Sequence, residues 1–262
     1  MSGRAAQRID LRGMVLPVAL VAAAELLVRS RGLRSDAIAA PSEVLLAWLR
    51  ALVDGTLLSA TAETLACAVA GLAIGFTLGV VLGTIFGLRG LVDELMEVTI
   101  EAIRPIPPVA LIPIALLVYG FGYRLEIAIV VFATLWPAMI FTRTAIRGIA
   151  PRLFEVAKAL ELSPRERIFK IVIPAALPQI FVALRLSAAI SLIVAVTVEV
   201  TANTIGLGHE MMMAQSSLHP DLMLALLVWT GVLGWMINAA MLLAQRLLFP
   251  FSIAERTGEA AR

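Results

Sequence analysis

Residues 65–88 read LACAVAGLAIGFTLGVVLGTIFGL, a run of 24 residues without a single charge. About 20 apolar residues in a helix cross the hydrocarbon core of a bilayer, so this run predicts a transmembrane helix. Its glycines recur at every fourth position and therefore share one stripe of the helix, where the missing side chains let another helix approach closely. We expect this stripe to pack against a helix of the same chain or of a second copy. The stripe consists of Gly71, Gly75, Gly79, Gly83 and Gly87.

The rest of the chain has the same character. Of its 262 residues, 60% are hydrophobic and only 15% are charged, and the mean hydropathy is +0.95. Soluble domains carry about 25% charged residues, so this composition predicts an all-α integral membrane protein. We expect one transmembrane domain at 13–249, between a cytoplasmic N-terminus at 1–12 and a cytoplasmic tail at 250–262.

Uncharged runs predict about six transmembrane helices. They lie near residues 14–28, 65–88, 105–123, 127–142, 178–198 and 222–245. The first run also resembles a signal peptide, since Arg4, Arg8 and Arg12 precede it and Ala22–Ala24 offers a cleavage site. An uncleaved helix is the favoured alternative, because the apolar run continues to Val28. Residues 42–58 have apolar side chains at helical spacing and predict a helix along the membrane surface.

Positive charge indicates the orientation. If the N-terminus is inside, the cytoplasmic segments hold fifteen Lys and Arg residues and the outer segments hold five. Positively charged loops stay on the cytoplasmic side, so we expect both termini there and a multi-pass protein of the cell (inner) membrane. The basic loop between the fourth and fifth helices, coupling loop 151–174, would then be cytoplasmic.

This loop contains the polar stretch EVAKALELSPRERIFKIVIP, residues 155–174. It predicts a helix from 152 to 160, a break, and a second helix with its own start. Ser163 is the expected N-cap, Pro164 the first helical residue, and Glu166 the third, which together make a capping box. Pro174 is expected to stop or kink this second helix. A helix–break–helix can serve as a binding surface for a partner protein.

The same stretch resembles the cytoplasmic EAA loop of bacterial ABC importer permeases, most closely the nitrate, sulfonate and taurine type. The family pattern is EAA, three residues, Gly, nine residues and I-x-L-P; here Glu155-Val156-Ala157 begin it and Ile171-x-Ile173-Pro174 end it. Glu161 occupies the glycine position, where a left-handed conformation at the helix end would cost a Glu about 1 kcal/mol or more. The resemblance covers roughly residues 65–249.

The resemblance implies a permease subunit that forms a path for a small, anionic solute by alternating access. It implies a second permease copy, an extracytoplasmic binding protein, and an ABC ATPase that carries ATP and Mg²⁺ and docks on this loop. The docking residues would be Leu153, Phe154, Glu155, Val156, Ala157, Leu160, Glu161, Ser163, Arg165, Arg167, Ile168, Ile171 and Pro174.

Several residues near the predicted spans are candidates for the path. Arg185 is a charge inside the fifth span and either reaches the path or snorkels to the cytoplasmic surface. Glu199, with Thr197, Thr201 and Asn203, marks the outer end of the same helix, as part of an outer gate or as an ordinary interfacial end. The prolines at 105, 107, 108, 113 and 137 should bend or break their helices.

Other functions lack their motifs. The two lysines follow Ala157 and Phe169, so no P-loop exists, and we expect no enzyme and no cofactor on this chain. His209 and Glu210 begin a zinc-like motif whose second His is replaced by Met213, so no metal site is expected. The basic residues are not interleaved with aromatics, so no nucleic-acid partner is expected. The acidic residues cluster at the ends of the predicted spans, whereas a proton-coupled carrier would usually need buried carboxylates. A secondary carrier and a non-transporting membrane protein remain as alternatives.

Overall fold

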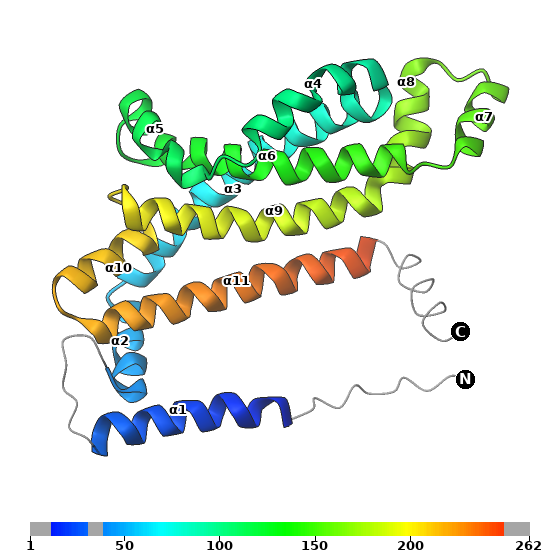
Figure 1. Ribbon diagram of the computed structural model, residues 1–262. Coiled ribbons are helices and arrows are strands. Elements are labelled where there is room, and N and C mark those ends of the chain that lie inside the picture. Colours follow the sequence, from blue (N-terminus) through cyan, green and yellow to red (C-terminus); the bar gives the residue numbers. More distant parts are fainter. Residues whose placement is uncertain (1–11, 31–38, 249–262) are drawn as a thin grey trace, which may run out of the picture. The chain divides into compact units, whose positions relative to one another are not determined.

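The computed structural model describes residues 12–30 and 39–248, and every regular element within these ranges is a helix (Figure 1). The terminal segments expected at 1–12 and 250–262 lie outside the described residues, except Arg12. The prediction of an all-α chain is confirmed. In order, the elements are α1 (Arg12–Ser30), α2 (Pro41–Val53), α3 (Thr56–Leu88), α4 (Gly90–Ile103), the 3-10 helix η1 (Pro108–Leu111), α5 (Ile112–Tyr119), α6 (Tyr123–Arg147), α7 (Pro151–Ala159), α8 (Pro164–Arg167), the π-helix η2 (Ile168–Val172), α9 (Ile173–Thr201), α10 (Gly206–Ser216) and α11 (Pro220–Leu248).

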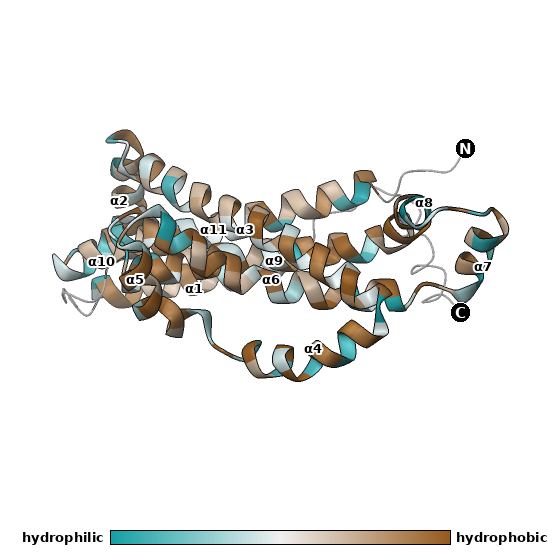
Figure 2. Ribbon diagram, turned by 90° about the horizontal axis from the view of Figure 1, so that it is seen from above, coloured by the Kyte–Doolittle hydropathy of each residue, from teal (hydrophilic) through white to brown (hydrophobic). Residues whose placement is uncertain are grey.

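Four stretches of the described chain are long and apolar enough to cross a membrane. They are Thr56–Leu88, Tyr123–Arg147, Pro164–Ser216 and Pro220–Leu248. Figure 2 shows hydrophobic residues along most of α6 and α9. With 33 residues, α3 rises about 50 Å, which is longer than the ~30 Å of a hydrocarbon core. Its first turns therefore extend beyond the uncharged run that predicted it.

The expected third span, 105–123, is not a single helix. Its α-helical part, α5, has 8 residues and rises only about 12 Å. The reason is the prolines, because each lacks the N–H that a continuous helix needs. Together with α4, this part forms a pair bent by 82°, either a broken span or a re-entrant loop. The described residues therefore hold four spans, or five with this pair, and the total of six stays a prediction.

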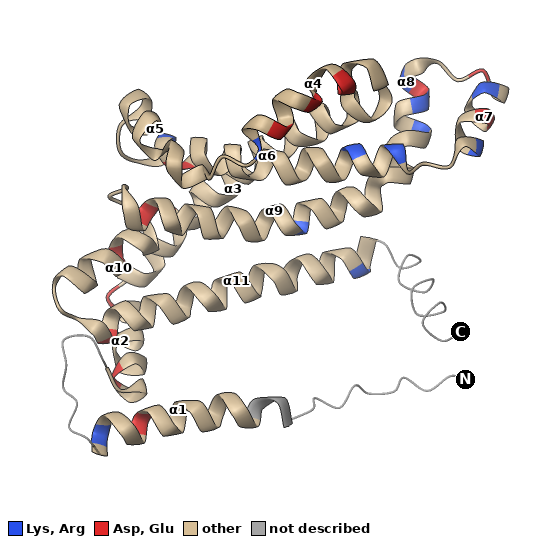
Figure 3. Ribbon diagram, in the orientation of Figure 1, with Lys and Arg blue, Asp and Glu red and all other residues tan. Residues whose placement is uncertain are grey.

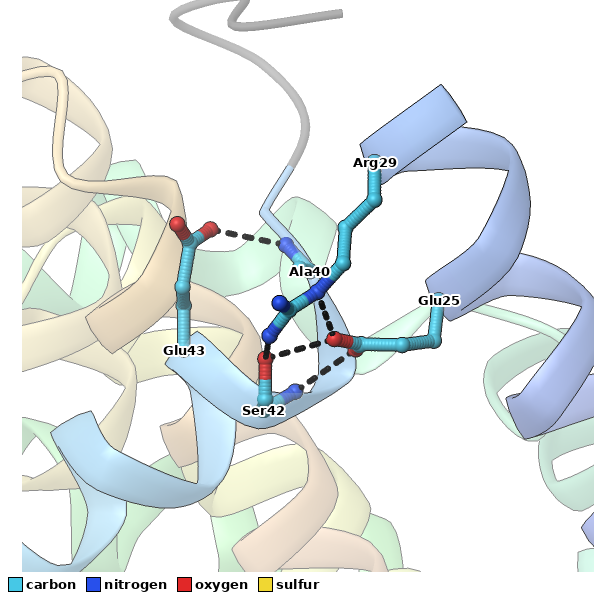
Figure 4. Close-up of polar contacts among 5 residues, drawn as sticks. All are labelled: Glu25, Arg29, Ala40, Ser42 and Glu43. Atoms are coloured by element: carbon cyan, nitrogen blue, oxygen red, sulfur yellow. Dashed lines mark hydrogen bonds and ion pairs between the residues drawn. The ribbon is translucent and has the colours of Figure 1, made fainter. Parts of the chain in front are cut away.

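One compact unit of the chain contains the described residues 12–30, 39–58 and 210–229. Here α1 is tied to the start of α2: Glu25 accepts hydrogen bonds from the Ser42 backbone N–H at 3.0 Å and from its hydroxyl at 2.8 Å (Figure 4). Arg29 pairs with Glu25 and also donates to Ser42. The helix expected at 42–58 ends at Val53, because Gly55 turns the chain with a φ of +86°.

The second compact unit contains residues 59–209 and 230–248 of the described chain. Its centre is the pair α6 and α9, which run side by side in opposite directions (Figure 1). Near the start of α6, Ile129 and Val130 pack against Ala195 and Val198 of α9. Near its end, Ala145 and Ile146 pack against Val172, Ala176 and Ile180. Pro137 lies inside α6, which continues through it as one helix.

The glycine stripe of α3 faces α6. A Cβ atom added at Gly79 would lie 2.6 Å from the Ala138 Cβ and from the Leu135 carbonyl oxygen. Added at Gly83, it would lie 2.5 Å from the Met139 carbonyl oxygen. Side chains at these positions would push the two helices apart, so the stripe serves packing within one chain. The same holds for Gly71, Gly75 and Gly87, which face Val130, Thr134 and Ile146.

An ion cluster joins α4 to the end of α6. The Asp93 side chain is buried and pairs with Arg143 at 2.6 Å and also with Arg147. Figure 3 shows that the Lys and Arg residues of this unit gather at this end of α6 and on α7 and α8. The positive charge that indicated a cytoplasmic loop is therefore concentrated at one end of the α6–α9 pair.

Candidate functional site

The predicted helix–break–helix forms at this basic end. The first helix is α7, and the second starts at Pro164 after the N-cap Ser163. The Ser163 hydroxyl accepts from the Glu166 backbone N–H at 3.3 Å, and the Glu166 carboxylate accepts from the Ser163 N–H at 3.0 Å. Both bonds of the predicted capping box are present, so the start of α8 has a defined position without help from a partner.

The break itself depends on Glu161. Its φ is +50°, the left-handed conformation that a glycine adopts without strain. The Glu161 N–H donates to the Lys158 carbonyl at 3.0 Å, and the Leu162 N–H donates to the Ala157 carbonyl at 3.0 Å. These two bonds are the Schellman arrangement that ends a helix. The chain thus keeps the backbone geometry of a glycine position although a Glu occupies it.

One of the two alternatives for Pro174 was wrong: the second helix does not stop there, because Pro174 falls in the first turn of α9, where its missing N–H is tolerated. The other alternative, a kink, agrees with Figure 1, in which the chain changes direction between α8 and α9. The five residues before α9 form the π-helix η2, with the Ile173 N–H bonded to the Ile168 carbonyl. Single π turns inside helices are commonly found at functional sites. The second helix of the loop therefore passes without a gap into α9.

The surface of this segment mixes apolar and charged side chains. Leu160 is 65% exposed, Val156 48% and Leu153 39%. Arg165 and Arg167 are exposed as well, and the Arg167 guanidinium lies 6.0 Å from the centre of the Phe154 ring. A groove of about 370 Å³ separates the two helices. It is lined by Phe154, Glu155, Ala157, Lys158, Leu162 and Arg167.

The remaining predicted docking residues differ in exposure. Ala157 is buried, and Ile168 and Ile171 are half-buried, so these three support the fold of the loop more than its surface. Glu155, Glu161, Ser163 and Pro174 are exposed. Sequence analysis missed Phe169, an aromatic side chain that is 69% exposed on η2. Its position in a basic segment, directly before Lys170, was the available signal.

Glu166 also forms an ion pair with Lys170, one helical turn further along the chain. Its second carboxylate oxygen accepts from the Lys170 ammonium at 2.8 Å. The Lys170 bond and the Ser163 bonds lower the pKa of Glu166 to about 2. The carboxylate is therefore ionised at any physiological pH, and the capping box is complete.

The path candidates do not share one surface. Arg185 lies on α9 between the two clusters packed against α6, and its Nε donates to the Asn238 side chain of α11 at 3.0 Å. Thr197 and Thr201 bond backbone carbonyls of α9. Glu199 and Asn203 are 1% and 5% exposed, so neither faces an open path.

Glu199 and Asn203 instead belong to a buried polar cluster with Glu126 of α6. The Asn203 amide donates to Glu126 at 2.8 Å, and its carbonyl oxygen accepts from the Gly122 N–H at 2.8 Å. Glu199 accepts from the Gly208 N–H at the start of α10, at 2.8 Å. Glu126 was not singled out from the sequence, because its partners are about 75 residues away along the chain.

The start of α10 is held from α3 as well. The Gly206 N–H donates to Glu63 at 2.9 Å, and the Leu207 N–H donates to the Thr64 hydroxyl at 2.9 Å. These contacts explain the polar residues that directly precede the uncharged run of α3. Among the described residues, no group of His, Cys, Asp and Glu side chains has the arrangement of a metal site.

Residues 75–252 match the family model described as "Binding-protein-dependent transport system inner membrane component". The match covers more than half of the chain. The chain belongs to this family. It is therefore a permease of the ABC importer class, a transport component and not an enzyme.

The names of several relatives of the permease state a transported solute. It is 25% identical over 91% of its length to a Bacillus subtilis protein provisionally assigned as an aliphatic sulfonates transport permease, SsuC, of which it covers 86%. It is 25% identical over 76% of its length to the taurine transport system permease TauC of Escherichia coli, of which it covers 72%. Nitrate import permeases are also among the relatives.

Solved structures agree on the fold. The permease matches a chain of the inward-facing MetNI methionine ABC transporter with a TM-score of 0.64 and 20% identity, over 71% of the permease and 92% of that chain. A chain of an amino acid ABC transporter matches with a TM-score of 0.61 and 18% identity, over 75% and 96%. The helical arrangement thus recurs in transporters of different solutes.

Proposed function

We propose that this chain forms the solute path of an ATP-driven importer and that a separate ATPase drives it through α7, α8 and η2. The observation that carries the proposal is the exposed apolar surface of this capped helix pair. Exposed apolar side chains beside cations are what a docking interface needs. The partner would supply ATP and Mg²⁺.

Leu160→Asp tests this docking. The charge falls in the centre of the apolar surface, so we expect co-purification of the ATPase to fall at least tenfold, which corresponds to about 1.4 kcal/mol. Leu218→Asp is the matched control, because Leu218 is similarly exposed, at 60%, but lies in the α10–α11 loop. ATPase binding that survives Leu160→Asp would show that the partner docks elsewhere.

The proposed solute is a small anion such as a sulfonate, taurine or nitrate. The names of the relatives support this class, and Arg185 is the charge that would meet the anion inside the span. We expect Arg185→Gln to lower uptake at least tenfold, with ATPase co-purification unchanged. Arg185→Lys, which keeps the charge, should retain more uptake than Arg185→Gln. Equal uptake in all three proteins would remove Arg185 from the path.

Alternating access is the proposed mechanism. Because α8 and η2 lead without a gap into α9, a push on the docking surface reaches a helix packed along α6. A second permease copy would complete the path, and an extracytoplasmic binding protein would deliver the solute. Uptake into vesicles should require the ATPase, ATP and the binding protein. Uptake without ATPase would favour a secondary carrier, and no uptake under any condition a non-transporting protein.

A further inference from the structure

The buried cluster at the start of α6 contains two neighbouring acids. Glu126 is 0% exposed and Glu199 is 1% exposed, and their carboxyl groups lie close enough to interact. They come from two different helices, and neither has a Lys or Arg partner in the described chain. A carboxylate removed from water needs a partner, and two carboxylates in contact also repel each other.

In each of the two acids, one carboxyl oxygen accepts a hydrogen bond and the other does not. Oε2 of Glu126 accepts from Asn203, and Oε2 of Glu199 accepts from the Gly208 N–H. Oε1 of Glu126 and Oε1 of Glu199 are both buried and accept no hydrogen bond. Buried polar atoms without a partner are rare, and here two of them belong to neighbouring groups.

A proton placed between the two acids removes both difficulties. It cancels one of the two charges, and the resulting O–H donates to the remaining carboxylate. Pairs of buried acids that share one proton are known in aspartic proteases, for the same electrostatic reason. A metal ion is a poorer fit, because the described residues contain no group of three His, Cys, Asp or Glu side chains that could hold one.

We propose that Glu126 and Glu199 form a proton-binding site in which Glu126 carries the proton and donates it to the Glu199 carboxylate. The assignment follows from the surroundings. Glu199 faces the N-terminus of α10, whose partial positive charge and N–H groups stabilise an anion. Glu126 meets the neutral Asn203 amide, the Cys67 side chain and Glu199, and none of these is a cation.

Other titratable groups face the pair and bear on the test. Cys67 and Glu63 approach from α3, and Tyr123 lies at the start of α6. Glu63 is half-buried and has its own donor, the Gly206 N–H. It is therefore the matched control: an acid next to the pair that is less buried and accepts a backbone hydrogen bond.

Infrared spectroscopy of the purified full-length chain in nanodiscs at pH 7 tests the site. We expect a carbonyl stretching band of a protonated carboxyl group that shifts in D₂O. Glu126→Gln should abolish the band, because the amide replaces the protonated acid, and Glu199→Gln should shift it, because the Glu126 O–H loses its carboxylate acceptor. Glu63→Gln should leave it in place. A missing band in the unmodified chain, or a band lost only in Glu63→Gln, would overturn the proposal.

Thermal unfolding provides the folding control. Glu126→Gln keeps a donor toward Glu199 and an acceptor for Asn203, so its unfolding temperature should stay within about 2 °C of the unmodified chain. Glu126→Ala should unfold at a clearly lower temperature. Replacing Na⁺ by choline should change nothing. An unfolding temperature that depends on Na⁺ and loses this dependence in Glu126→Gln would assign the site to a cation instead.

Discussion

Glu161 has a backbone conformation that is unfavourable for a residue with a side chain. Its left-handed φ of +50° ends α7 and turns the chain toward α8. A side chain in this conformation is strained, and glycine is not. The break forms nevertheless, because the two Schellman hydrogen bonds and the capping box on its far side hold the backbone from both ends.

Glu161→Gly should stabilise the permease by about 1 kcal/mol, because it removes this strain. The gain should appear as a higher unfolding temperature, and uptake should be kept or improved. Glu161→Ala is the control, since it removes the carboxylate but keeps the Cβ and should show no comparable gain. A loss of both stability and uptake in Glu161→Gly would mean that the Glu161 side chain makes a necessary contact.

Glu166 predicts a local pH dependence. Its pKa in the folded loop is about 2, below the ordinary carboxyl value, so its contribution is present above about pH 4.3 and is lost as the pH falls toward 2. Hydrogen exchange at residues 163–167, corrected for the intrinsic rate, should lose protection between pH 5 and pH 3, at least in part. Glu166→Gln should show low protection at both pH values; the same pH response in that variant would exclude Glu166 as the cause.

At the scale of elements, the contact of α3 with α6 depends on missing side chains. Gly79→Ala places a methyl group 2.6 Å from Ala138 and from a backbone oxygen that cannot move freely. Overpacking of this kind costs about 1–3 kcal/mol. We therefore expect a lower unfolding temperature for Gly79→Ala.

Gly231 of α11 is the matched helical control. A Cβ there would meet nothing within 4 Å, so Gly231→Ala should be neutral or stabilising, by up to about 1 kcal/mol, through helix propensity. Equal effects of Gly79→Ala and Gly231→Ala would show that propensity, and not the close approach of α3 to α6, decides the outcome.

At the scale of the whole molecule, the orientation in the membrane is open to a direct test. Cys67 is buried, with 0% exposure, so the unmodified chain offers a nearly silent background for thiol labelling. We expect Ser163→Cys to react from the cytoplasmic side and Ser217→Cys from the outer side, because charge places residue 163 inside. Labelling of both from one side would refute the proposed topology.

The class of fold and the helix–break–helix of residues 151–167 were predictable because their causes are local. Uncharged runs such as 65–88 need only length and composition to indicate helices that can span a membrane. Ser163, Pro164 and Glu166 cap a helix through contacts within four residues, and the left-handed break follows from the hydrogen bonds of a single helix end. The family pattern that begins at Glu155 is also local, and it indicated a permease of an ABC importer.

Tertiary structure decided the rest, because the partners are distant in sequence. The glycine stripe was visible in the sequence, but only folding assigned it to α6 of the same chain. Glu199 and Asn203 read as a polar end of a helix, yet Glu126, Gly122 and α10 close around them and bury them. The prolines indicated a break in the third span, but its angle of 82° depends on how α4 and α5 pack. Burial and pairing are properties of groups brought together in space, and no single segment contains them.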